Sequence, residues 1–302
     1  MTRLFTVLIL LMSGLSAYAQ SCSSVDLRPT AGGRVLGEVR NQGGMTWCSS
    51  FVTADLLSFR QRQRVSALGV AIHWMNRPAD PQTLRQRAQA GTVPVLERYG
   101  SNAGLVMRSL RGRFQCLERD LPSDDNVINT LRGTLERIAE VKRQFDRTHQ
   151  CPAPSVQAVR SMFPRLTSED VLNTLRVSAL QDVHKNLLYR NCRGQYINVA
   201  DSNLSLSHNW SDLDTQLSRG NLVAFAYNSN VLKNANDTGT GRGHTSTVVG
   251  RRVRNGQCEY LIRNSWGRSC GYYDKKFPCE QGQIWVPKAN LLRSANDFFY
   301  YP

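Results

Sequence analysis

The stretch that decides the fold runs Asn41-Gln42-Gly43-Gly44-Met45-Thr46-Trp47-Cys48-Ser49-Ser50-Phe51. Its glycine pair predicts a tight turn, and a helical pattern follows from Ser49 to about Arg62. Cys48 would then lie at a helix N-terminus, where unpaired backbone N–H groups and the helix dipole favour a thiolate. The amide of Gln42, a little upstream, can point at the same place. A thiolate beside an amide donor suits acyl transfer, which needs a nucleophile and a hydrogen bond to the developing oxyanion.

A second group of polar residues lies far downstream. His244 opens a predicted strand within residues 243–250, and Asn264 ends another predicted strand in the run Asn264-Ser265-Trp266-Gly267. A histidine can take the proton of a thiol, and an asparagine can hold the imidazole in the required tautomer. The two stretches together therefore indicate a Cys-His-Asn site.

The order Gln-Gly-x4-Cys-x2-Phe, His-x5-Gly, Asn-Ser-Trp-Gly resembles the papain family of cysteine peptidases, in a bacterial-type exported form without an N-terminal propeptide. By this resemblance Cys48 is the nucleophile and His244 is the general base and acid. Asn264 orients the imidazole, Gln42 is the oxyanion donor, and Trp266 shields the Asn–His hydrogen bond from water. These four reactive residues and Trp266 are our candidate site.

The chain departs from the family pattern on both sides of these residues. The cysteine that normally precedes the nucleophile is absent, and Trp47 stands before Cys48 instead of after it. The Trp-Gly that normally follows Asn-Ser-Trp-Gly is replaced by Cys270-Gly271. The departures affect the expected substrate surface and disulfide pattern and leave the four reactive positions intact.

The family also has a glycine-rich strip that binds the substrate backbone. By resemblance the candidates for that strip are Asn102, Ala103 and Gly104. The alternative interpretation is a simple turn before the helical pattern that ends at Leu110.

The resemblance implies an α+β, papain-like two-lobe fold with the active-site cleft between the lobes. We expect a helical lobe at about 41–200, with a helical insertion at about 124–190, and an antiparallel β-barrel-like lobe at about 215–302. The insertion is inferred because Cys48 and His244 lie roughly 50–65 residues further apart than the family's about 130–150. It either adds core to the helical lobe or overhangs the cleft.

Periodicity gives the coarse secondary structure. Apolar steps of three and four predict helices over 126–150 and 168–189; Pro152 and Pro154 break the pattern between them, and the entry to the second, from Thr167 to Asp170, offers cap residues. The run 222–227 is typical of a buried strand, and Asn255-Gly256 predicts a hairpin between the strands of His244 and Asn264. Residues 20–40 show little periodicity and are expected to form an extended arm. His73, beside a tryptophan in an apolar run, is interpreted as a structural histidine and not as a rival base.

Residues 1–19 have the pattern of a signal peptide: a positive start, a short apolar run and a small-residue cleavage site, so residues 20–302 would be a secreted or periplasmic mature protein. The net charge of +15 favours anionic partners such as envelope polymers. Nucleic acid is not expected, because the basic residues are scattered and no recognisable nucleic-acid module accompanies them. A monomer is expected.

The chain has eight cysteines, and in an oxidising compartment most should form disulfides. Setting Cys48 aside leaves an odd number, so at least one more thiol is free or pairs between chains. Cys270 with Cys279 is the predicted local bridge. Ligand spacing for a metal is absent, and neither a metal nor a cofactor is expected.

The predicted function is an exported cysteine endopeptidase, a hydrolase acting on a protein or peptide substrate. Without a propeptide, restraint would come from export, a protein inhibitor or the inserted helices. Two alternatives stay open: a Cys-His amidase acting on cell-wall peptides, and a catalytically silent papain-like protein that binds an anionic polymer. The presence of all four reactive residues argues against the silent protein.

Overall fold

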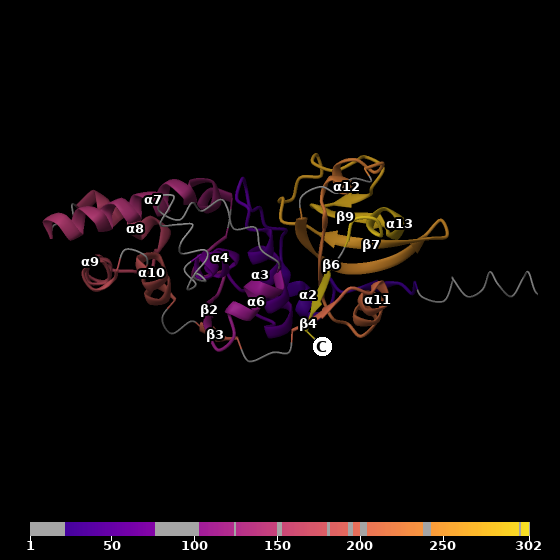
Figure 1. The fold of residues 1–302 in the computed structure, drawn as a ribbon, viewed down its shortest axis with the longest axis horizontal. Coiled ribbons are helices and arrows are strands. Elements are labelled where there is room, and N and C mark those ends of the chain that lie inside the picture. The colour runs from indigo at the N-terminus through magenta and orange to yellow at the C-terminus, as the bar shows by residue number, and fades with distance from the viewer. Residues whose placement is uncertain are drawn as a thin grey trace, which may run out of the picture.

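A computed structural model describes residues 22–75, 103–123, 125–149, 153–179, 182–192, 196–199, 204–237, 243–295 and 297–301. Within them the chain forms an α+β fold with a helical lobe and a lobe built on one antiparallel sheet (Figure 1). Helix α3 (Cys48–Gln61) lies where the two lobes meet and packs on the sheet. The described helices include none long and apolar enough to cross a membrane.

Helix α3 is buried on nearly every side. Every residue from Cys48 to Ser58 is buried, because α2 (Ala31–Leu36), α4 (Ala67–Met75), α6 (Ala103–Ser109) and the sheet surround it. Its buried polar side chains have hydrogen-bond partners within the helix or on neighbouring elements; the Ser58 hydroxyl donates to Ala54 O at 2.6 Å, and Asp55 accepts from Arg40 and Arg263. The predicted helix from Ser49 is confirmed and starts one residue earlier, at Cys48.

The other helices of the helical lobe form a group that lies in the chain between two short strands. They are α7 (Asp125–Thr148), α8 (Ala153–Met162), α9 (Ser168–Val177) and α10 (Val183–Asn191). Strands β2 (Phe114–Cys116) and β3 (Tyr196–Asn198) pair antiparallel, and a disulfide joins Cys116 to Cys192 with a Cα–Cα distance of 5.4 Å. The group therefore enters and leaves the lobe at nearly the same point, as an insertion must.

Two predictions for this region were wrong in detail. A single helix over 168–189 was predicted, but Ser178 is extended (φ −90°, ψ 137°) and ends α9. Apolar periodicity continues across the break, so it does not reveal the turn. Helix α8 was also missed, because Pro152 and Pro154 were interpreted only as breakers; Pro154 lies in the first turn of α8, where a missing N–H costs no hydrogen bond. The predicted cap at Thr167 is confirmed as a capping box with Asp170.

The inserted helices pack on the helical lobe. Helix α10 contacts α4, where the His73 ring bonds the Tyr189 hydroxyl at 3.2 Å and Ser109 O at 3.1 Å. Figure 1 shows α8, α9 and α10 at the end of the molecule, with α4 and α3 between them and the sheet. The structural role of His73 agrees with its prediction, and the placement of these helices favours added core over a cleft cover.

The sheet has the strand order β4-β10-β5-β6-β7-β9-β8, and β1 pairs with β6. The strands are β1 (Val25–Asp26), β4 (Ser205–Ser207), β5 (Val223–Asn228), β6 (Gly243–Arg254), β7 (Gln257–Arg263), β8 (Cys279–Glu280), β9 (Gln283–Pro287) and β10 (Asp297–Tyr300). Strands β1 and β4 lie before residue 215, where the β lobe was predicted to begin. Short helices α11 (Trp210–Ser218), α12 (Asn230–Lys233) and α13 (Lys288–Leu291) border the sheet.

Strands β6 and β7 form the long hairpin at the centre of the sheet. Its two-residue turn has Asn255 at φ 51° and Gly256 at φ 73°, the pair of positive angles that a type I′ turn requires. The hairpin predicted at Asn255-Gly256 is confirmed. It places His244, in β6, and Asn264, just after β7, at the same end of the sheet.

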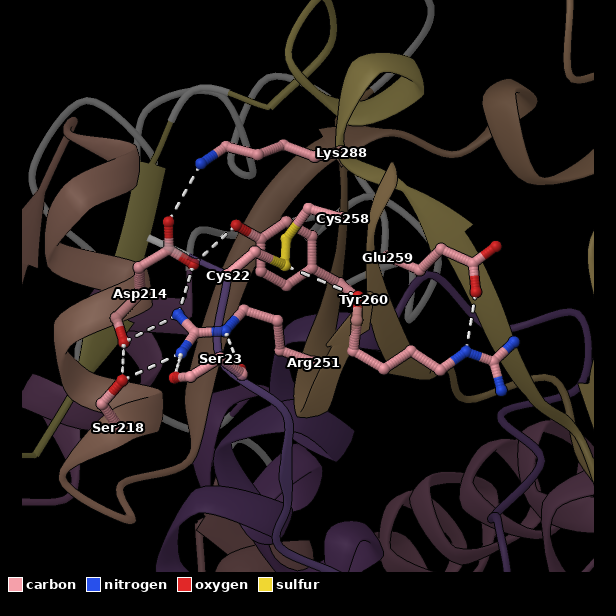
Figure 2. Close-up of a disulfide and its surroundings, with 10 residues drawn as sticks. Cys22, Ser23, Asp214, Ser218, Arg251, Cys258, Glu259, Tyr260 and Lys288 are labelled. Atoms are coloured by element: carbon pink, nitrogen blue, oxygen red, sulfur yellow. Dashed lines mark hydrogen bonds and ion pairs between the residues drawn. A yellow bond between two sulfur atoms is a disulfide. The ribbon is translucent and has the colours of Figure 1, made fainter. Parts of the chain in front are cut away.

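The N-terminal segment was predicted to be an extended arm, but it contains β1 and α2. It is attached to the sheet by the Cys22–Cys258 disulfide and by the buried guanidinium of Arg251 (Figure 2). Arg251 donates to Ser23 O at 2.8 Å and to Asp214 Oδ1 at 2.7 Å, while Asp214 also binds the Lys288 ammonium. Tertiary contacts of this kind fix a segment that has no periodicity of its own.

A second buried charge cluster connects the lobes. Asp55 of α3 accepts from Arg263 Nε at 2.9 Å and from Arg40 Nη1 at 2.8 Å, and Arg40 also pairs with Glu118 at 3.0 Å. The other guanidinium nitrogens of Arg263 donate to backbone carbonyls of residues 36–38. Because Arg263 directly precedes Asn264, this cluster fixes the end of β7 against α3.

Candidate active site

Cys48 is the first residue of α3. The helix has no side-chain cap at Trp47 and no acidic residue in its first turn, so its positive end is not neutralised there. Burial raises the pKa of the Cys48 thiol, but a hydrogen bond and the charge of His244 outweigh it. With smaller effects from the Thr245 backbone and Ser49, they lower the pKa from 9.0 to about 7. The sulfur is thus held in the state a nucleophile needs.

His244 lies between Cys48 and Asn264. Its Nε2 atom is 2.7 Å from Asn264 Oδ1, which leaves Nδ1 for the thiol. The backbone N–H of Ser265 donates to the same Asn264 atom at 2.8 Å. A backbone N–H can only donate, so that atom is the amide oxygen, and Nε2 of His244 must carry a proton. This tautomer lets Nδ1 exchange a proton with the sulfur.

Aromatic rings enclose the imidazole. Trp266 packs on His244 with ring centroids 5.3 Å apart, and Tyr273 stacks on Trp266 at 5.7 Å. Tyr227 meets the other side of His244 edge-on at 5.7 Å, and the Lys233 ammonium lies 5.0 Å over the Trp266 ring. His244 and Asn264 are 8% and 2% exposed, so their hydrogen bond is shielded from water.

Gln42 is fixed to the Asn264–Gly267 segment. Its backbone N–H donates to Ser265 O at 2.9 Å, and its side-chain oxygen accepts from the Ser265 hydroxyl. Its amide nitrogen donates to Met45 O at 2.5 Å, which uses one of two N–H bonds. Gly43 has φ 58°, a conformation that glycine adopts without strain, and this allows the tight turn between Gln42 and Cys48.

The structure brings Gln42, Cys48, His244, Asn264 and Trp266 together from three parts of the chain. Pairing of Asn41 with Trp266 joins the loop before α3 to the segment after β7. Of the predicted substrate-binding strip at 102–104, the structure describes two residues. Ala103 and Gly104 are buried at the start of α6, where Ala103 O accepts from the Thr53 hydroxyl of α3 at 3.5 Å, and Asn102 lies outside the described residues.

The cysteines fall into three disulfides and one described free thiol. Cys22–Cys258, Cys116–Cys192 and the predicted Cys270–Cys279 are bonded, while Cys48 is free and buried. Cys151 lies outside the described residues. In the part of the chain that the structure describes, no group of histidine, cysteine and carboxylate side chains has the arrangement of a metal site.

Two residues of the site were missed from sequence: Ser246, whose hydroxyl donates to Asn264 Oδ1 at 3.1 Å, and Tyr227, whose hydroxyl lies 3.0 Å from Ser246 Oγ. A signal for Ser246 was present, because residues two apart on a strand share a face and His244 opens that strand. Tyr227 had no such signal, since its position opposite His244 depends on the pairing of β5 with β6.

No protein-family model matches the sequence, and no curated protein matches it either. Solved structures do. A digestive procathepsin L 3 from Tenebrio molitor larval midgut is 13% identical over 93% of this chain and 70% of its own, with a TM-score of 0.49. A cysteine protease from Carica candamarcensis, solved with E-64, is 14% identical over 92% of this chain and 97% of its own, and its TM-score is also 0.49. SERA5E from Plasmodium falciparum is 12% identical over 87% of this chain and 88% of its own, with a TM-score of 0.47.

Proposed function

We propose that the protein is an exported cysteine endopeptidase that hydrolyses peptide bonds by a Cys-His-Asn thiolate mechanism. The observation that carries the proposal is the connected series Cys48–His244–Asn264, in which the thiol pKa is lowered by the imidazole and the imidazole tautomer is fixed by the amide. A structural cysteine would need neither feature, because it only fills space.

In the proposed reaction Cys48 Sγ attacks the carbonyl carbon of the scissile peptide bond. The oxyanion is bound by the Gln42 amide and by the Cys48 N–H, which lies in the unpaired first turn of α3. The C–N bond breaks as His244 donates a proton to the leaving amine, which gives a thioester. His244 then takes a proton from water, the hydroxide attacks the thioester carbonyl, and the acid product leaves with the thiolate restored.

The disulfides support the part of the proposal that places the protein in an oxidising compartment. Three disulfides among the described residues fit export to such a compartment. The basic chain would attract anionic envelope polymers, and a protein inhibitor remains one way to restrain activity. We propose a monomer, and because Ala103 and Gly104 are buried at the start of α6 we do not assign them to the substrate surface.

The nearest alternative is a Cys-His amidase acting on cell-wall peptides. It would use the same thiolate and the same oxyanion donor, and the net charge of +15 would favour an anionic wall polymer. A catalytically silent binding protein is less well supported, because it has no need of a lowered thiol pKa.

The test exposes purified residues 20–302 to an epoxide probe for papain-like thiolates, beside Cys48→Ala. The same samples are assayed on casein, a mixed peptide library and purified peptidoglycan. Labelling lost in Cys48→Ala, together with peptide cleavage, is the expected result. Labelling with cleavage of peptidoglycan alone would replace the endopeptidase with the amidase. Absence of labelling in folded, reduced protein would overturn the catalytic proposal.

A further inference from the structure

The amide oxygen of Asn264 accepts three hydrogen bonds. The donors are His244 Nε2 at 2.7 Å, the Ser265 backbone N–H at 2.8 Å and Ser246 Oγ at 3.1 Å. A carbonyl oxygen has two lone pairs, so three donors are more than the usual number. The Cys-His-Asn mechanism accounts for the first, and the chain geometry after β7 accounts for the second. The Ser246 hydroxyl is left without a role.

The direction of these hydrogen bonds follows from the chemistry of the donors. The Ser265 N–H identifies the Asn264 atom as oxygen, so the Ser246 hydroxyl must donate its proton to it. Ser246 Oγ is then free to accept, and the Tyr227 hydroxyl, 3.0 Å away, donates to it. The result is a chain of hydrogen bonds in which Tyr227 donates to Ser246 and Ser246 donates to the Asn264 amide that holds His244.

This series is buried and comes from adjacent strands. Ser246 is fully buried and Tyr227 is 2% exposed. Ser246 follows His244 by two positions on β6 and shares its face, and Tyr227 pairs with His244 across β5 and β6. Both hydroxyls are therefore shielded from water and held on paired strands.

The other end of the amide is less constrained. Asn264 Nδ2 is buried and makes no well-aligned hydrogen bond within the described residues, although the Tyr273 hydroxyl lies beside the amide. An amide turned by 180° would present Nδ2 to His244, where it would donate to Nε2 and place the remaining proton on Nδ1. That tautomer cannot accept the proton of Cys48. Bonds to the oxygen therefore decide whether the histidine is competent.

We propose that Ser246, backed by Tyr227, is a positioning residue that holds the Asn264 amide with its oxygen toward His244 and so maintains the Cys48–His244 pair. The proposal rests on the cysteine chemistry proposed above. Ser246 acts through Asn264 and does not touch the sulfur or the substrate. Its loss is expected to change the protonation of the pair and kcat, with KM unchanged.

The test follows the pH dependence of Cys48 alkylation by iodoacetamide, which needs no substrate. Among the described residues, the titratable groups near the pair are Tyr227 of β5, Tyr273 after β7 and Lys233 of α12. Burial raises the pKa of Tyr273 to about 12 and that of Tyr227 well above 10, so neither tyrosine ionises between pH 5 and 9. Lys233 is unchanged in the variants. A shift in this range therefore reports on the Cys48 thiol in its changed surroundings.

For Ser246→Ala we expect a higher apparent pKa of Cys48 and alkylation slower by about fivefold at pH 6.5, the effect of one neutral hydrogen bond. Tyr227→Phe should shift the profile in the same direction by less, and Ser246→Thr, which keeps the hydroxyl, should restore it. A Cys151→Ser background removes the other thiol outside the three disulfides, and Cys48→Ala gives the blank.

The matched control is Thr247→Val, on the same strand but on its opposite face, where the hydroxyl donates to Arg263 O at 3.3 Å. It should alter the thermal midpoint without moving the alkylation profile. The proposal is overturned if Ser246→Ala and Thr247→Val have the same alkylation profile. It is also overturned if Ser246→Ala lowers the thermal midpoint of unfolding but leaves the alkylation profile unchanged. A wild-type profile near that of an ordinary thiol would instead refute the proposed function, so the two failures are distinguishable.

Discussion

The reactivity of Cys48 depends on one neighbour more than on its own burial. Burial by itself raises the thiol pKa, and His244 reverses that effect to give about 7. Below its pKa the sulfur carries a proton, so reactivity is lost as the pH falls through about 7 and not through 9. At neutral pH about half of the sulfur is thiolate, against a few per cent for an ordinary cysteine.

Replacement of His244 by alanine should remove this advantage. In His244→Ala only burial and the two weaker hydrogen bonds remain, so the alkylation midpoint of Cys48 is expected to rise by about two pH units or more. The measurement is the iodoacetamide rate from pH 5 to 10. An unchanged midpoint would show that the helix N-terminus alone lowers the pKa.

The Gln42 amide should contribute in the transition state. Gln42→Ala is expected to lower kcat by about 100–1,000-fold with little change in KM, as for other oxyanion donors. Ser265→Ala is the matched control: it removes the hydrogen bond that braces the Gln42 oxygen but keeps the donor, so its loss should be much smaller. Equal losses would mean that the loop, and not the donor, matters.

Lys233 should influence which peptides are cleaved. Its ammonium lies over Trp266, next to His244, which we propose protonates the leaving amine, and no described carboxylate pairs with it. We expect peptides with Asp just after the scissile bond to be cleaved faster than those with Lys. Lys233→Gln should reduce that preference by about two- to fivefold, the effect of one exposed charge pair. High salt should reduce it too, whereas a preference unaffected by both changes would contradict the assignment.

At the scale of elements, we expect the inserted helices to contribute to the core and not to catalysis. Leu187 of α10 is fully buried, while Val177 at the end of α9 is 72% exposed. Leu187→Ala should lower the free energy of unfolding by about 2–5 kcal/mol, and Val177→Ala should change it by less than about 0.5 kcal/mol. Urea unfolding measures both. A large loss of kcat in folded Leu187→Ala would instead connect these helices with the site.

At the scale of the whole molecule, the two lobes are held by Asp55 between Arg40 and Arg263. Asp55→Asn leaves the two buried cations Arg40 and Arg263 with only the Glu118 carboxylate paired to them among the described residues, and should lower the free energy of unfolding by about 3–5 kcal/mol. Glu38→Gln breaks the exposed pair with Arg268 and should cost less than about 1 kcal/mol. Equal effects in urea unfolding would show that the buried cluster does not join the lobes.

Local sequence determined much of this protein. Cys48 at a helix start, the Asn255-Gly256 hairpin, the Thr167 cap and the Cys270–Cys279 bridge each depend on residues close together in the chain, so their patterns can be read directly. The four residues of the proposed Cys-His-Asn site were predicted in the same way, from short motifs, and their catalytic roles stay a prediction.

Tertiary structure alone decided the remainder, because it depends on which distant segments pack together. Residues 22–40 are attached through Arg251 and the Cys22–Cys258 bond, and the extended Ser178 ends α9 where apolar periodicity gave no signal. The partner of Ser246 depends on strand register, which places Tyr227 opposite His244. Sequence determined which groups could do the chemistry, and long-range pairing decided which atoms of those groups face one another.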